Sequence, residues 1–151
     1  MKKNSILITL IVFFLISCGY KPVFLNKKNN FDIEKIEIVT SNRLGKSIKN
    51  SLNYISNKNS LKKINLLIDS QKTKNITSKD SKGNVQLLTM SLSVNVKIYE
   101  NDEMKSERQF SESFSYSNDT NKFNLSQYEK NIERNLINNI IKNISIYLVS
   151  F

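Results

Sequence analysis

The sequence contains no histidine or tryptophan, and only one cysteine, one proline and three glycines in 151 residues. Without histidine, the chain lacks the usual general base near neutral pH and the commonest metal ligand. A single cysteine excludes an internal disulfide and a cysteine-rich zinc site. Because the common catalytic arrangements need these residues, we expect a binding or structural protein with no catalytic residues, no metal and no cofactor.

Arginine is also scarce, with 3 arginines against 20 lysines and a net charge of +10. Proteins that read bases or grip phosphates favour arginine, because its planar guanidinium makes two parallel hydrogen bonds where lysine offers a point charge. The 22 asparagines and 19 isoleucines, like lysine, have A/T-rich codons, so part of the basic excess reflects codon usage. We therefore expect no nucleic-acid partner.

The amino terminus has the pattern of an export signal. Two lysines precede a largely apolar run of 11 residues, Ile6 to Ile16, which Thr9 interrupts. A charged start before a short apolar run is typical of a signal peptide, whereas a membrane-spanning helix needs about 20 residues. A buried core helix is the alternative. We interpret residues 1–17 as a lipoprotein signal peptide.

The only cysteine lies at the end of this run. Leu15-Ile16-Ser17-Cys18 resembles the lipobox of bacterial lipoproteins, in which the cysteine sulfur takes a diacylglycerol and its freed amine a further chain such as palmitate. Several chains anchor a protein stably where one binds marginally. A lone buried cysteine is the alternative. Cys18 is therefore our predicted lipidation site, residues 18–30 a lipid-anchored tether, and Gly19 is compatible with sorting to the outer membrane.

Hydrophobic periodicity predicts the first half of one domain over residues 31–151. Alternating apolar residues indicate a strand over 33–40, and an apolar face at spacings of three and four indicates a helix over 42–56. A second strand is expected over 61–77, although its far end is weakly defined. The residues that set these periods are Ile36, Ile38, Leu44, Ile48, Leu52, Ile64, Leu66 and Ile68.

The second half begins after a turn signal at residues 81–84. Six in-phase apolar residues then predict a strand with one buried and one solvated face. Apolar residues on even positions from Met104 to Tyr116 predict its antiparallel partner; the turn type between the strands stays open. The six residues are Leu88, Met90, Leu92, Val94, Val96 and Ile98.

A long helix closes the chain. Ser126 followed by Glu129 has the spacing of a capping box, so we expect the helix to begin at Ser126. The predicted fold class is α+β: a four-stranded, mostly antiparallel sheet with two amphipathic helices on one face, in the order β-α-β-β-β-α. The expected stripe on the last helix is Tyr128, Ile132, Leu136, Ile140, Ile144 and Leu148, widened by Ile137 and Ile141.

The lipobox cysteine, the stretch Cys18-Gly19-Tyr20-Lys21-Pro22-Val23-Phe24 and this order of elements together resemble the LptE family of lipopolysaccharide-assembly lipoproteins. The resemblance implies a lipid-anchored plug on the periplasmic face of the outer membrane. It also implies two partners, an LptD-like β-barrel whose assembly the lipoprotein supports, and lipopolysaccharide, which it helps deliver to the outer leaflet.

The positive charge is concentrated in residues 41–82, which hold ten cations and two carboxylates. Such a cluster attracts lipid phosphates or matches an acidic barrel interior. Our candidate contacts with lipopolysaccharide or the barrel are Lys72, Lys74, Lys79 and Lys82. A solvated surface inflated by codon usage is the alternative.

Two other functions stay open. One is a generic outer-membrane lipoprotein whose α/β domain binds another periplasmic protein or ligand. The other is a carboxylate-dependent enzyme, which would require Asp69 or Glu112 to be buried in a cleft. The sequence offers no paired acids with an evident common site.

Overall fold

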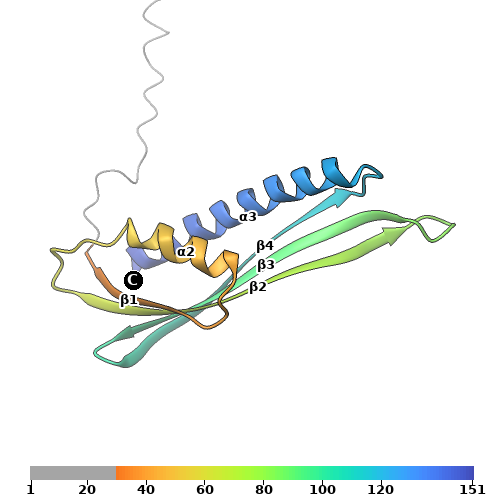
Figure 1. Cartoon of the computed structure of the whole chain (residues 1–151). Helices are drawn as coiled ribbons and strands as arrows, with labels where there is room; N and C mark the ends of the chain where they lie inside the picture. The colour runs from red at the N-terminus through yellow and green to blue at the C-terminus, as the bar shows by residue number, and fades with distance from the viewer. Residues whose placement is uncertain (1–29) are drawn as a thin grey trace, which may run out of the picture.

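The computed structural model describes residues 30–151. It contains β1 (Asp32–Ile38), α2 (Arg43–Asn53), β2 (Lys63–Lys79), β3 (Val85–Glu100), β4 (Glu103–Ser117) and α3 (Lys122–Ser150). The strands form one sheet in the order β1-β2-β3-β4, and both helices lie on the same face of it (Figure 1). The predicted α+β class and element order are thereby confirmed. The expected signal peptide, Cys18 and nearly all of the tether lie outside the described residues.

The one parallel pair, β1 with β2, needs a crossover, which α2 supplies. Asn42 caps α2, since its side-chain oxygen accepts from the Gly45 N–H at 2.8 Å. The Asn42 amide also donates to the Ser70 carbonyl at 2.7 Å, which fastens the helix start to β2. Gly45 brings the helix close to the sheet, because a Cβ there would lie 2.8 Å from Cγ2 of Ile38.

The core lies between the helices and the covered face of the sheet. All six apolar residues of the alternating run in β3 are buried, as predicted. From α3, the predicted stripe residues Ile132, Leu136, Ile140, Ile144 and Leu148 are buried against them. The apolar residues that recur at every second position in β3 and about every 3.6 positions in α3 therefore pack against each other in one apolar layer.

The start of α3 differs from the prediction. The helix begins at Lys122, and Asn121 caps it by accepting from the N–H groups of Phe123 and Asn124 at 3.1 and 3.2 Å. The predicted capping box at Ser126 is therefore wrong. The earlier start adds a turn that buries Leu125, whereas Tyr128, predicted on the buried stripe, is 48% exposed.

A two-residue turn joins β3 to β4. Glu100 pairs with Glu103, and both residues between them have positive φ, 52° at Asn101 and 63° at Asp102. Positive φ at both central positions is the mark of a type I′ turn, whose twist matches that of the flanking strands. This result supplies the turn type that the sequence left open.

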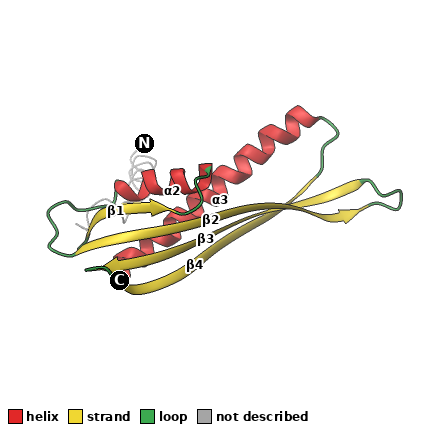
Figure 2. Ribbon diagram, turned by 60° about the horizontal axis from the view of Figure 1, so that its bottom comes forward, coloured by secondary structure: helices red, strands yellow, loops and turns green. Residues whose placement is uncertain are grey.

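The other face of the sheet carries no helix (Figure 2). Its central residues are short and neutral, and they pair across three strands in the predicted polar pattern. Neither α2 nor α3, the helices of residues 30–151, is long and apolar enough to cross a membrane. The central residues of the open face are Gln71, Thr73, Asn75, Thr89, Ser91, Ser93, Ser111, Ser113 and Ser115.

Candidate functional site

Two of the four candidate lysines join the sheet to α3. The Lys72 Nζ donates to Oε2 of Glu133 at 2.7 Å, and the Lys74 Nζ lies 3.2 Å from Oε1 of Glu129. Both lysines occupy even positions of β2, which face the helices, and their side chains are 40% and 47% exposed. These cations are therefore already paired within the domain.

The other two lysines lie at the end of the β2–β3 hairpin, which extends past the start of α3 (Figure 1). Neither Lys79 nor Lys82 makes an ion pair with any acid among residues 30–151. Asp80 orders the loop by accepting from the N–H groups of Lys82 and Asn84 at 2.9 and 2.8 Å. The hydrogen bonds from Asn84 lower the pKa of Asp80. The structure thus separates the four lysines into a paired set and an unpaired one.

The Glu129 carboxylate is the centre of a polar cluster that the sequence did not indicate. The Tyr116 hydroxyl donates to Glu129 Oε1 at 2.7 Å, and the Tyr116 ring packs edge-on against Tyr128, with centroids 6.1 Å apart. Burial raises the pKa of Glu129, but the hydrogen bonds from Tyr116 and Lys74 outweigh burial and leave the pKa below its ordinary value. Burial and the bond to Glu129 raise the pKa of Tyr116.

A basic groove of about 500 Å³ lies between α2 and α3. Its cations are Arg43 from α2 and Lys130 and Arg134 from α3, and Arg134 Nη2 donates to Oδ1 of Asn131 at 2.8 Å. Within the described chain, Arg43 and Lys130 have no acidic partner. The sequence could not indicate this groove, because its residues come from helices about 90 positions apart.

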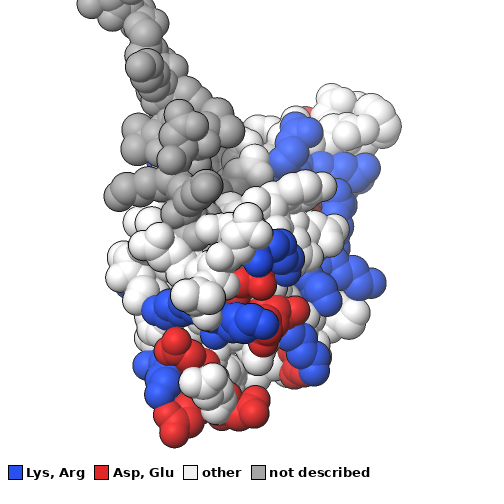
Figure 3. Space-filling view, turned by 90° about the vertical axis from the view of Figure 1, so that its left-hand side faces the viewer, with Lys and Arg blue, Asp and Glu red and all other residues white. Residues whose placement is uncertain are grey.

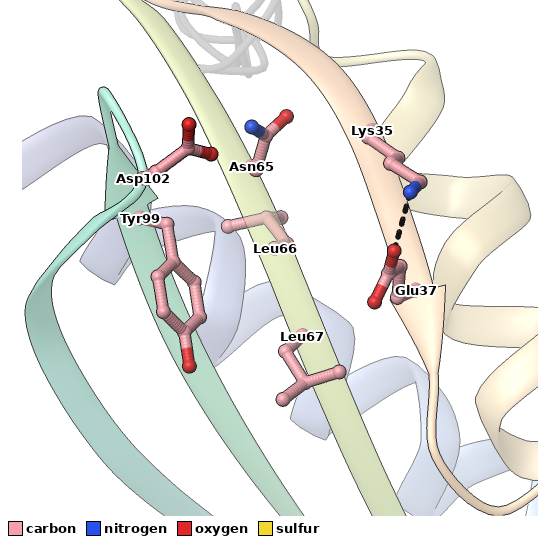
Figure 4. Close-up of a pocket in the computed structure, with 7 residues that line it drawn as sticks. All are labelled: Lys35, Glu37, Asn65, Leu66, Leu67, Tyr99 and Asp102. Carbon is pink, nitrogen blue, oxygen red and sulfur yellow. Dashed lines mark ion pairs between the residues drawn. The ribbon is translucent and has the colours of Figure 1, made fainter.

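A hollow of about 290 Å³ lies on the open face of the sheet (Figure 4). Lys35 and Glu37 form one wall and are paired with each other at 2.5 Å. The hydrogen bond between them raises the pKa of Lys35 and lowers that of Glu37. The opposite side holds the Tyr99 ring and Asp102, which the type I′ turn places there. Leu67 gives the hollow an apolar part, so it suits a small ligand with mixed polar and apolar surface.

The end of the domain formed by β1 and the β3–β4 turn carries acidic and basic side chains in alternation (Figure 3). Several of these charges are paired locally: Lys63 lies 2.6 Å from Glu34, and Lys105 lies 2.5 Å from Glu103. The unpaired cations described above lie elsewhere, on the hairpin tip and in the basic groove.

The acids considered for a carboxylate-dependent enzyme are not neighbours. Asp69 lies on the open face and accepts from Thr40 Oγ1 at 2.9 Å. Glu112 lies on the covered face and accepts from Asn143 Nδ2 at 3.1 Å. In the described part of the chain, no three acidic side chains gather at a point that could hold a metal ion.

The fold defines a class of small α+β domain with one face of a mixed sheet covered by helices, and solved structures share it. No family model matches the sequence, and no curated protein matches it. A minor lipoprotein from Acinetobacter baumannii superposes with a TM-score of 0.61 at 15% identity, covering 81% of this chain and 92% of that one. Rare lipoprotein B from Shewanella oneidensis gives 0.54 at 12% identity, covering 77% and 97%.

A third structure, the uncharacterized lipoprotein B from Nitrosomonas europaea, gives a TM-score of 0.57 at 12% identity and covers 83% of this chain and 87% of that one. At these identities the likeness establishes the fold. The structural neighbours are thus bacterial lipoproteins, and the described domain spans most of each of them.

Proposed function

We propose that this protein is an LptE-like outer-membrane lipoprotein that plugs and supports assembly of an LptD-like barrel and helps deliver lipopolysaccharide to the outer leaflet. The observation that carries the proposal is the fold, shared over most of the length of three bacterial lipoproteins. The lipobox at Leu15 to Cys18 supports the same class independently of the fold.

The proposed anchor is Cys18, with residues 18–30 as the tether on the periplasmic face of the outer membrane. Cys18→Ala removes the sulfur that would carry the lipid, so the variant would be released from membranes into the periplasmic fraction. Membrane fractionation of cells that produce each form tests this part. Full retention of the variant in the membrane would count against the lipid anchor.

The open sheet face fits a position against a polar barrel wall, because its central side chains are short, neutral and able to donate and accept hydrogen bonds. Four cations without an acidic partner in the described chain suit lipid phosphates: Lys79 and Lys82 on the hairpin tip, and Arg43 and Lys130 in the basic groove. A lysine or arginine beside a phosphate forms charge-assisted hydrogen bonds.

Purification of the full chain in detergent from its native membranes tests the partner. A stoichiometric large β-barrel would support the proposal. A different periplasmic protein or ligand would support the alternative, a generic lipoprotein with a binding domain, and turnover of a substrate by the isolated chain would support an enzyme. Mass spectrometry of the purified complex distinguishes these outcomes.

A further inference from the structure

Strand β4 forms one edge of the sheet along its whole length of 15 residues (Figure 2). It pairs with β3 on one side, and no strand within residues 30–151 pairs with its other side. Natural proteins protect such edges with charges, prolines, bulges or short strands, because the free backbone N–H and C=O groups can pair with another chain. The first half of β4 carries Glu103, Lys105, Glu107 and Arg108, whereas from Gln109 to Ser117 the only charged residue is Glu112 and the register is unbroken.

The opposite edge of the sheet is protected in the usual ways. Strand β1 has only 7 residues, and its register shifts between Ile33 and Lys35. Charged residues occupy four of its 7 positions: Asp32, Glu34, Lys35 and Glu37. Beyond β1 this edge continues along Asp69 to Lys79 of β2, where Lys72, Lys74 and Lys79 and the register shifts after Ile76 protect it. Among the described strands, the β4 edge is therefore the longest regular edge open to a further strand.

A groove of about 360 Å³ runs beside the β4 edge, under the outer flank of α3. Phe110 and Tyr147 form its inner wall, with ring centroids 5.7 Å apart. Ile146 of α3, which also lines the groove, is 46% exposed. Phe114, further along β4, is 45% exposed. A strand added to β4 would cover these apolar side chains as well as the free backbone groups.

We propose that this edge pairs with β4 of a second copy of the chain, antiparallel, to form a continuous eight-stranded sheet about a two-fold axis. The register in which all 15 residues are paired places Phe110 opposite itself. In that same register Arg108 faces Glu112 of the partner subunit, and the two-fold axis repeats the pair. The register of longest overlap is thus also one of charge complementarity.

Neighbouring registers lose this complementarity. A shift that centres the pairing on Gln109 puts Arg108 opposite Phe110 of the partner subunit, and a shift that centres it on Ser111 puts Arg108 opposite Phe114 of the partner subunit. In the proposed register the remaining charges, Glu103, Lys105 and Glu107, face serines, so no like charges oppose each other. The charge pattern of β4 therefore favours one alignment with its own copy.

The dimer is a state of the free protein and does not depend on the proposed function. A copy that entered a barrel would have to release its partner first, so the dimer and the plug would be alternative states. Failure of one proposal leaves the other standing, because the dimer is assayed on the isolated chain and the plug by purification with its barrel.

Sedimentation velocity of the detergent-solubilised full chain tests the dimer. We expect the unaltered chain to dimerise below about 0.1 mM. Arg108→Glu and Glu112→Arg should each weaken the dimer about tenfold or more, because each sets like charges opposite each other twice. The double reversal should restore it. Lys105→Glu is the matched control, since it changes the charge equally but faces serine, and circular dichroism confirms that each variant is folded.

Disulfide trapping tests the register. The double variant Gln109→Cys/Ser111→Cys puts cysteines opposite each other across the axis, so mild oxidation should give a covalent dimer. Gln109→Cys/Ser113→Cys is out of register and should not, and the unaltered chain gives the baseline for Cys18. A monomer at about 0.1 mM, a dimer that ignores the charge reversals, or equal trapping of both cysteine pairs would overturn the proposal.

Discussion

The Tyr116 hydroxyl donates a 2.7 Å hydrogen bond to the Glu129 carboxylate, which links the end of β4 to the first half of α3. Lys74 on β2 reaches the same carboxylate oxygen from the other side, at 3.2 Å. In this half of the helix Leu125 and Ile132 are the buried apolar residues. Polar bonding at Glu129 therefore supplements sparse apolar contact where α3 meets the far end of the sheet.

Tyr116→Phe should lower the free energy of unfolding by about 1–2 kcal/mol. The ring stays in place, since Tyr116 is 3% exposed, but Glu129 loses its buried donor. Urea unfolding of both proteins measures the difference. Tyr128→Phe is the control: the Tyr128 hydroxyl has no hydrogen-bond partner among the described residues, so its loss should change stability by less than about 0.5 kcal/mol. Equal effects from the two variants would contradict the role of the bond.

Glu129→Gln should make stability less dependent on acid pH. The pKa of Glu129 is lower in the folded chain than its ordinary value of 4.5. Ionised Glu129 therefore stabilises the fold fully above about pH 4.5, and this contribution is lost as the pH falls through the folded-state pKa. Unfolding free energies measured from neutral pH to about pH 3 should show the gap between wild type and Glu129→Gln narrowing with acid. A constant gap would show that ionisation of Glu129 does not contribute.

Gly45→Ala should destabilise the domain by about 1–3 kcal/mol, although alanine is the better helix former. The added Cβ would lie 2.8 Å from Cγ2 of Ile38 and 3.1 Å from Oγ of Ser70, so α2 must move away from the sheet. Asn50→Ala, at an exposed position of the same helix, should leave stability unchanged or raise it slightly. Thermal unfolding followed by circular dichroism compares the two. A Gly45→Ala protein as stable as the wild type would mean that the helix can shift at no cost.

Local patterns predicted the elements because each period repeats over many residues. The six in-phase residues of β3 and the stripe from Ile132 to Leu148 gave a strand and a helix whose buried faces could meet in only a few ways. The start of α3 could not be predicted as well, since Asn121 and Ser126 are both good caps. What distinguishes them is burial of Leu125 and the bond from Tyr116 to Glu129, and both depend on tertiary packing.

The sequence predicted which segment holds the candidate lysines, but not which of them are paired with acidic residues in the fold. Lys72 and Lys79 lie in one basic segment of the sequence, yet Glu133 of α3 lies beside Lys72 and no acid of the described chain pairs with Lys79. The basic groove was missed for a related reason, since Arg43 and Arg134 become neighbours only when α2 packs beside α3. The way the helices pack across the sheet therefore determines which cations have an acidic partner.

Because Lys72 and Lys74 are paired within the domain and Lys79 and Lys82 are not, substitutions in the two pairs should have different effects. Lys79→Glu/Lys82→Glu should weaken binding of lipopolysaccharide without changing the free energy of unfolding by more than about 0.5 kcal/mol, because neither lysine has an acidic partner within residues 30–151. Lys72→Glu/Lys74→Glu carries the same change in charge but places glutamates against Glu133 and Glu129, so it should cost about 1–2 kcal/mol of stability. Calorimetric titration with lipopolysaccharide, paired with urea unfolding, separates the two effects. Unchanged binding by the Lys79→Glu/Lys82→Glu protein would exclude the hairpin tip as a lipid contact and favour a solvated surface there.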